Sequence, residues 1–90
     1  MKKHVTIRVY GKVQGVFFRQ TSMEKAQEHG LTGFAQNEPD GSVYIEAEGD
    51  ETRLTSFITW CQSGPPAAKV TKVTAEEDEL KGYEKFEVRR

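Results

Sequence analysis

Two kinds of hydrophobic spacing alternate along this chain, and their order restricts the fold more than any other feature. Residues 5–10 and 42–48 alternate apolar and polar side chains, a period of two that is typical of strands with one buried face. Residues 54–61 instead place Leu54, Phe57, Ile58 and Cys61 at the i, i+3, i+4 and i+7 positions of one helix face. The chain therefore combines one-faced strands with helices able to cover them.

Breaks between these segments predict where each element begins and ends. We expect a first helix that starts at Thr21, because Thr21 and Glu24 have capping-box spacing, and that stops at Gly30. A second helix is predicted to open at residues 49–51 and to end before Gly64-Pro65-Pro66. Strands are expected over the following ranges: 5–10, 33–37, 42–48, 69–75 and, as a short closing strand, 83–88.

Two acidic stretches are predicted to be turns. Glu38-Pro39-Asp40-Gly41 has turn composition and would join two strands into a hairpin. The acidic run over residues 76–79 is expected to be a solvated turn.

The order strand, helix, strand, strand, helix, strand is that of the split βαβ motif. We therefore predict an α+β fold, a ferredoxin-like βαββαβ sandwich whose antiparallel sheet carries both helices on one face. At 90 residues the chain is predicted to form a single domain over 1–90. A chain this small buries only about 60–65 % of its unfolded surface, so we expect a shallow site built largely of backbone.

Charge and cysteine content argue against several classes of function. Thirteen Lys and Arg against fourteen Asp and Glu give a net charge of −1, whereas nucleic-acid binders carry a basic stripe. Cys61 is the sole cysteine, so it can form neither an internal disulfide nor a zinc site alone. The sequence shows no signal peptide and no run of about 18 apolar residues. We expect a reduced, cytoplasmic protein that does not enter a membrane.

The stretch from Gly11 to Arg19 is the most informative for chemistry, because it joins a predicted strand to a predicted helix. Its glycines permit positive φ, so backbone N–H groups can form a concave anion site at the helix N-terminus. The guanidinium of Arg19 can bind two phosphate oxygens at once. The loop lacks the Gly-Lys-Ser/Thr ending of a Walker A loop, and Val13 stands where cysteine phosphatases have their thiol. From spacing alone, a phosphate loop and a plain glycine turn with a surface arginine both stay open.

Two separated motifs resemble the signatures of the acylphosphatase family. The first is Gly11-x-Val13-Gln14-Gly15-Val16-x-Phe18-Arg19, and the second is Gly33-Phe34-Ala35-Gln36-Asn37 followed by Gly41-x-Val43 and Gly49. The spacing between the motifs, Gly64-Pro65-Pro66 and the 90-residue length also agree with that family. The resemblance covers nearly the whole chain.

The resemblance implies hydrolysis of the carboxyl–phosphate bond of small acyl phosphates, giving a carboxylate and phosphate without a metal or cofactor. Arg19 and Asn37 would be the catalytic residues, Arg19 binding the phosphoryl group and Asn37 holding the attacking water. The phosphate-binding N–H groups would come from the loop residues Gln14, Gly15, Val16, Phe17, Phe18 and Arg19. We expect a monomer that acts on a small acyl phosphate, with no nucleic-acid or membrane partner.

Three positions depart from the family pattern. Phe34 stands where the family often has Trp, Gln36 where it often has Lys or Arg, and Glu38 where a small polar residue is usual. A carboxylate facing the site would repel phosphate. Because neighbouring strand residues point to opposite faces, we expect Glu38 to face away from Asn37.

Other residues have simpler structural interpretations. His4 and His29 could act as acid or base, but His29 in a last helical turn is explained by the helix dipole. Cys61 is expected to be a buried hydrophobe and Trp60 to pack beside it. Lys81-Gly82-Tyr83, on the predicted last strand, resembles the start of an RNA-binding motif, although the residues after it do not match. A regulatory small-ligand domain of the same fold is the other alternative.

Overall fold

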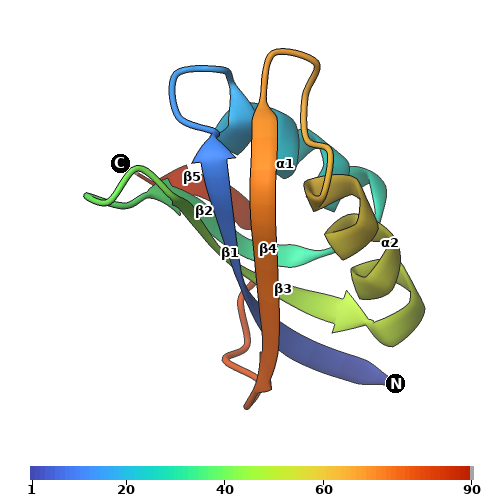
Figure 1. Cartoon of the computed structure of the whole chain (residues 1–90). Coiled ribbons are helices and arrows are strands. Elements are labelled where there is room, and N and C mark those ends of the chain that lie inside the picture. Colours follow the sequence, from blue (N-terminus) through green and yellow to red (C-terminus); the bar gives the residue numbers. More distant parts are fainter. Residues whose placement is uncertain (90) are drawn as a thin grey trace.

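A computed structural model describes residues 1–89 and shows a five-stranded sheet with two helices on one of its faces (Figure 1). Along the chain the elements are β1 (Lys2–Lys12), α1 (Phe18–Glu28), β2 (Thr32–Asn37), β3 (Val43–Asp50), α2 (Glu51–Cys61), β4 (Lys69–Asp78) and β5 (Phe86–Arg89). The strand order is β4-β1-β3-β2-β5. The predicted ferredoxin-like α+β fold is confirmed, with β5 added beside β2. Within residues 1–89, no helix combines the length and the apolar character needed to cross a membrane.

The sheet is mixed, so the prediction of a wholly antiparallel sheet is wrong at one edge. β1 pairs antiparallel with β3 and β4, and β2 pairs antiparallel with β3, but β5 pairs parallel with β2. The reason is the path of the chain. After β4 the chain crosses from one edge of the sheet to the other, so β5 starts at the end from which β2 also starts.

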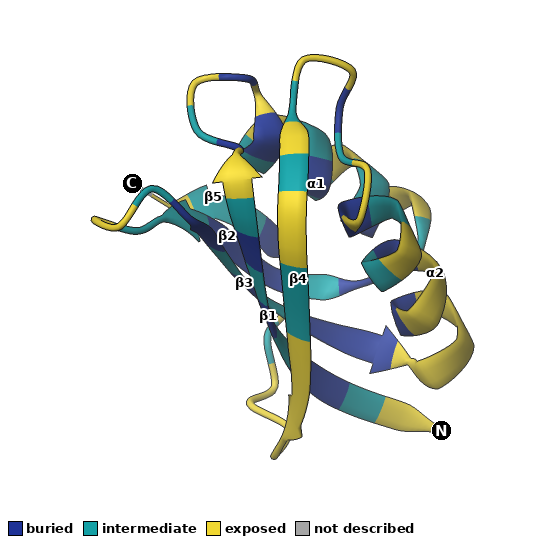
Figure 2. Cartoon of the chain, viewed as in Figure 1, coloured by how far each residue is buried: buried dark blue, intermediate teal, exposed yellow. Residues whose placement is uncertain are grey.

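The core lies between the sheet and the helices, as the period-two pattern predicts. In Figure 2 buried positions concentrate where the sheet meets the two helices, while β4 is largely exposed or intermediate. The inward-facing apolar residues of β1 and β3 meet one face of α2, and all are buried: Val5, Ile7, Val9, Val43, Ile45, Ala47, Leu54, Phe57 and Cys61.

The start of α1 differs from the sequence prediction. The helix begins at Phe18, and Thr21 lies inside it, so the Thr21–Glu24 capping box is wrong. Burial of Phe18 sets the first residue of the helix. Phe18 is 1 % exposed, and the centroid of its ring lies 5.5 Å from the ring centroid of Trp60. By contrast α2 opens where expected, and the Asp50 side chain accepts a hydrogen bond from the Thr52 N–H at 3.1 Å.

The C-terminal part of the chain contains two further corrections. β4 continues through Asp78, so most of the acidic run is strand and not a turn. Within β4, a carboxylate oxygen of Glu77 lies 3.1 Å from the Lys3 ammonium nitrogen. Lys81-Gly82-Tyr83 precedes β5, so the prediction that it lies on the last strand is wrong. The Lys81 and Gly82 N–H groups donate to the buried Glu48 carboxylate, which holds this crossing segment against the open face of the sheet.

Candidate active site

The loop between β1 and α1 owes its shape to residues with positive φ. Gly15 has φ 73° and Phe17 has φ 62°, both in the left-handed region. Just before the loop, near the end of β1, Gly11 has φ 121°, and a Cβ there would collide with the Lys69 carbonyl oxygen. No side chain among residues 1–89 caps the start of α1. The free N–H groups of its first turn are therefore open to an anion, at the positive end of the helix dipole.

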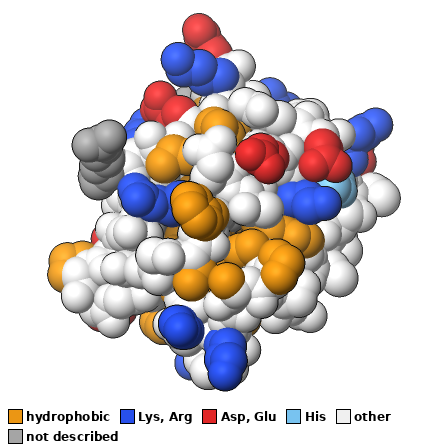
Figure 3. Space-filling model, turned by 90° about the horizontal axis from the view of Figure 1, so that it is seen from above, with side chains coloured by type: hydrophobic (Ala, Val, Ile, Leu, Met, Phe, Trp, Pro, Cys, Tyr) orange, Lys and Arg blue, Asp and Glu red, His pale blue; other side chains and the backbone are white. Residues whose placement is uncertain are grey.

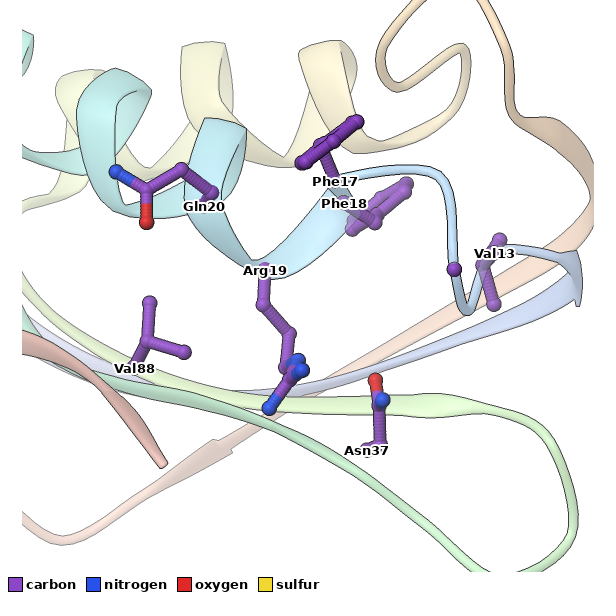
Figure 4. Close-up of a pocket in the computed structure, with 8 residues that line it drawn as sticks. Val13, Phe17, Phe18, Arg19, Gln20, Asn37 and Val88 are labelled. Atoms are coloured by element: carbon purple, nitrogen blue, oxygen red, sulfur yellow. The ribbon is translucent and has the colours of Figure 1, made fainter. Parts of the chain in front are cut away.

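A cleft of about 330 Å³ lies beside this loop (Figure 4). Five of the residues predicted for the site line it: Gly15, Phe17, Phe18, Arg19 and Asn37. Val13, Gln20 and Val88 also line it and were not predicted. Val88 comes from β5, where it pairs with Ala35 of β2. Its place depends on a pairing between strands that are distant in sequence, and no local motif signals that pairing.

Two predicted residues, Gln14 and Val16, do not line the cleft. Val16 is 9 % exposed and packs in the core. The Gln14 side-chain amide donates to the carbonyl oxygens of Glu38 at 2.8 Å and Ser42 at 2.9 Å. This side chain therefore ties the loop to the turn that follows Asn37. Sequence reasoning considered only the Gln14 backbone and missed the role of its side chain.

Arg19 is the one charged residue among the described residues lining the cleft. It is the second residue of α1, and its Nη1 donates to the Arg89 carbonyl oxygen at 2.9 Å. In Figure 4 its side chain runs from the helix toward the strand that carries Asn37. A guanidinium has five N–H donors, so this bond orients the fork while other donors still point toward the cleft.

Asn37 is the last residue of β2 and pairs with Val43 of β3. It lies on the helix-facing side of the sheet, as Ala35 does two residues earlier. Glu38 points the other way, with its carboxylate oxygen 3.7 Å from Arg8 Nη1. The expectation that Glu38 faces away from Asn37 is therefore confirmed, and its charge does not line the cleft.

The turn after Asn37 is held by its own side chains. Asp40 accepts from the Ser42 hydroxyl at 2.5 Å and from the Ser42 N–H at 2.9 Å. Both hydrogen bonds lower the pKa of the Asp40 carboxyl, and the one from the Ser42 hydroxyl contributes more than the one from the Ser42 N–H. The side chain therefore acts as a turn residue, as its position before Gly41 suggests.

The other candidate residues lie outside the cleft. His4 is buried on the far face of the sheet, with Nδ1 2.7 Å from a Glu48 oxygen, and His29 Nδ1 bonds the Lys25 carbonyl at 2.8 Å. Cys61 is fully buried, which raises the pKa of its thiol. Trp60 packs against Phe18 and Phe57, as expected for an edge-of-core residue.

The residues that line the cleft form an anion site without an obvious nucleophile or strong base. It has one guanidinium, the neutral amides of Gln20 and Asn37, and the N–H groups of a helix start. Among residues 1–89 no group of three or more His, Cys, Asp or Glu side chains is placed to hold a metal ion. Such a site can bind and orient charged oxygens and a water molecule, which is what phosphoryl transfer demands of a protein.

Known proteins share both the sequence and the fold. A family model described as acylphosphatase matches residues 5–88. A Thermotoga maritima protein named acylphosphatase is 47 % identical over 87 residues, which cover 97 % of each chain. The structure of an acylphosphatase from Coxiella burnetii is 39 % identical, with TM-score 0.95 over 98 % of this chain and 93 % of that one. The crystal structure of acylphosphatase from Bacillus subtilis is 37 % identical, with TM-score 0.95 over all of both chains.

Proposed function

The chain belongs to the acylphosphatase family of hydrolases, and from that premise we propose how its cleft hydrolyses small acyl phosphates. The observation that carries the proposal is the meeting of Arg19, Asn37 and the β1–α1 loop in one cleft. The reaction breaks the carboxyl–phosphate bond and releases a carboxylate and inorganic phosphate.

Phosphate binding is assigned to Arg19 and to the N–H groups of the loop from Gln14 to Arg19. The phosphoryl transition state spreads negative charge over its equatorial oxygens, so fixed donors around those oxygens lower the barrier. Arg19 supplies a planar fork, and its bond to the Arg89 carbonyl orients that fork before substrate arrives. Phosphate therefore binds to a largely pre-arranged set of donors.

Water positioning is assigned to Asn37. The attacking and leaving oxygens of a phosphoryl transfer are roughly in line, so the water must approach from the side opposite the acyl oxygen. A neutral amide can hold and orient that water but is a poor base. The water oxygen forms the new bond to phosphorus, the P–O bond to the acyl group breaks, and the water proton passes to a phosphate oxygen of the substrate.

The carboxylate is a good leaving group, so the reaction needs no strong general acid. This agrees with the cleft lining, where Arg19 is the one charged side chain among the described residues. We further propose that residues 1–90 act as a single catalytic domain. The enzyme would be a cytoplasmic monomer that needs no metal, cofactor or nucleic acid; gel filtration and cell fractionation test the monomer and its location.

The first experiment measures hydrolysis of benzoyl phosphate with a chelator present, for the wild type and for Asn37→Ala. We expect metal-independent turnover in the wild type and a loss of about 10²–10³-fold in the variant, as for other positioned donors. Gln36→Ala is the matched control, because Gln36 precedes Asn37 on the opposite face of β2 and does not line the cleft. It should keep the turnover of the wild type.

Three results would change the proposal. Equal turnover in the wild type and Asn37→Ala would keep the reaction and remove Asn37 from it. Turnover that stops with chelator and returns with a metal ion would contradict metal independence. A folded wild type that binds phosphate but hydrolyses no acyl phosphate would favour a binding module built on the same loop.

A further inference from the structure

Phe17 combines two features that are unfavourable in a residue with no function. Its side chain is 79 % exposed, so the ring gains almost nothing from burial. Its φ of 62° makes it the one residue other than glycine in the described chain with a left-handed backbone. A bulky aromatic residue in that region is a genuine outlier, and such outliers cluster at ligand sites.

The exposed ring stands at the rim of the candidate active site. Phe17 lines the cleft together with Arg19 and Asn37. Figure 3 views the molecule from above, where the β1–α1 loop lies, and shows hydrophobic side chains gathered near the centre of that face with basic side chains beside them. Phe18, the next residue, is buried and packs on Trp60, so Phe18 is a core residue whereas the Phe17 ring is exposed to solvent.

The direction in which the Phe17 ring projects indicates which part of the substrate it would contact. In Figure 4 Asn37 rises from β2 at the sheet side of the cleft, and Phe17 projects from the start of α1, above Arg19 and away from Asn37. If Asn37 holds the water, an in-line reaction places the acyl group on the side opposite Asn37. That is the side on which Phe17 projects.

We propose that Phe17 is the acyl-group subsite of this enzyme and selects acyl phosphates with an apolar, preferably aromatic, acyl group. The inference rests on the proposed function, because it takes the phosphoryl position from Arg19 and Asn37. A flat apolar acyl group can stack against the exposed ring and remove both surfaces from water. A small acyl group such as acetyl is too short to cover the ring.

The test compares kcat/KM for benzoyl phosphate and acetyl phosphate in the wild type, Phe17→Asn and Phe17→Leu. Asparagine accepts the left-handed backbone, so Phe17→Asn removes the ring without adding strain. We expect the benzoyl-to-acetyl ratio to fall about three- to tenfold in Phe17→Asn and less in Phe17→Leu, which keeps an apolar side chain. Leu80→Asn is the matched control, because Leu80 is 52 % exposed and does not line the cleft.

A second readout needs no turnover. Phenylphosphonate and methylphosphonate are compared as competitors of substrate or as ligands in calorimetry. We expect phenylphosphonate to bind more tightly than methylphosphonate in the wild type and to lose that advantage in Phe17→Asn. Both phosphonates would bind the same backbone N–H groups, so a change in that backbone affects both affinities alike and leaves their ratio unchanged.

Failure of this inference is distinct from failure of the proposed function. A benzoyl-to-acetyl ratio and a phosphonate ratio unchanged in Phe17→Asn, with the wild type active on both substrates, would overturn the subsite and leave the reaction intact. The same fall in Leu80→Asn would also overturn it. A wild type inactive on both acyl phosphates would instead contradict the proposed function.

Discussion

The side-chain amide of Gln14 donates to the Glu38 carbonyl oxygen at 2.8 Å, across 24 residues of sequence. The same nitrogen donates to Ser42 at 2.9 Å. One side chain therefore joins the loop that would bind phosphate to the residue after Asn37. This amide therefore holds the two halves of the candidate site in a fixed relative position.

Replacing Gln14 by Leu is expected to reduce both stability and turnover. Two partly buried carbonyl oxygens lose their donor, which costs roughly 1–3 kcal/mol in the free energy of unfolding. The loop and Asn37 also lose their fixed separation, so kcat should fall by more than the loss of folded protein explains. Urea unfolding and initial rates measure the two effects. Gln27→Leu, on the exposed side of α1, is the control and should change neither.

Arg19→Lys is expected to separate charge from geometry. Lysine keeps the positive charge but cannot donate two parallel bonds to phosphate, so the inhibition constant for inorganic phosphate should rise more than tenfold. Arg19→Ala should abolish detectable hydrolysis. Circular dichroism should show that both variants fold, because within residues 1–89 the Arg19 side chain makes one hydrogen bond, to the Arg89 carbonyl. Wild-type phosphate affinity in Arg19→Lys would contradict the bidentate role.

Gly15→Ala is expected to damage the loop through backbone strain alone. No atom lies within 4 Å of a Cβ placed at Gly15, but its φ of 73° costs an L-residue about 1–2 kcal/mol. Gly30, after α1, has φ 67° and the same open surroundings, so Gly30→Ala should lose similar stability. Hydrolysis measured beside thermal unfolding distinguishes the two. We expect kcat/KM to fall in Gly15→Ala and to stay at the wild-type value in Gly30→Ala.

Glu48 is expected to make the fold sensitive to acid. Burial raises the pKa of this carboxyl, but the Lys81 N–H, His4 and the Gly82 N–H outweigh it, and the pKa lies below the ordinary value of 4.5. A lowered folded-state pKa stabilises the protein above the unfolded-state pKa, and this contribution is lost as pH falls through the folded-state pKa. The free energy of unfolding should therefore decline below about pH 4.5.

The matched variants are Glu48→Gln and Glu79→Gln. Glu48→Gln should be less stable at neutral pH, by on the order of 1–3 kcal/mol, and should lose less stability on acidification. His4 lies between two carboxylates, with Nδ1 2.7 Å from Glu48 and Nε2 3.2 Å from Glu46, and both variants keep His4 and Glu46. Glu79 is exposed just after β4, and its replacement should leave the acid profile unchanged. An identical acid profile in Glu48→Gln would remove Glu48 as the cause.

Local patterns in the sequence predicted most of the fold. Alternation over residues 5–10 and 42–48 identified the buried faces of β1 and β3, and the spacing from Leu54 to Cys61 identified the buried face of α2. These predictions hold because a side chain's face depends on its neighbours two to four residues away. The paired motifs likewise selected Arg19 and Asn37, and the family to which the chain belongs.

Long-range packing decided the rest. Burial of Phe18 against Trp60 set the start of α1, overriding the capping spacing of Thr21 and Glu24. The crossing of the chain over Glu48 brought β5 parallel to β2, placed Val88 in the cleft and brought the Arg89 carbonyl to Arg19. Each of these features depends on contacts between residues far apart in sequence. Such contacts form only when the whole chain buries its apolar residues and pairs its polar groups. The motifs predicted which residues would carry the chemistry, whereas contacts between distant parts of the chain fix the positions of those residues in the fold.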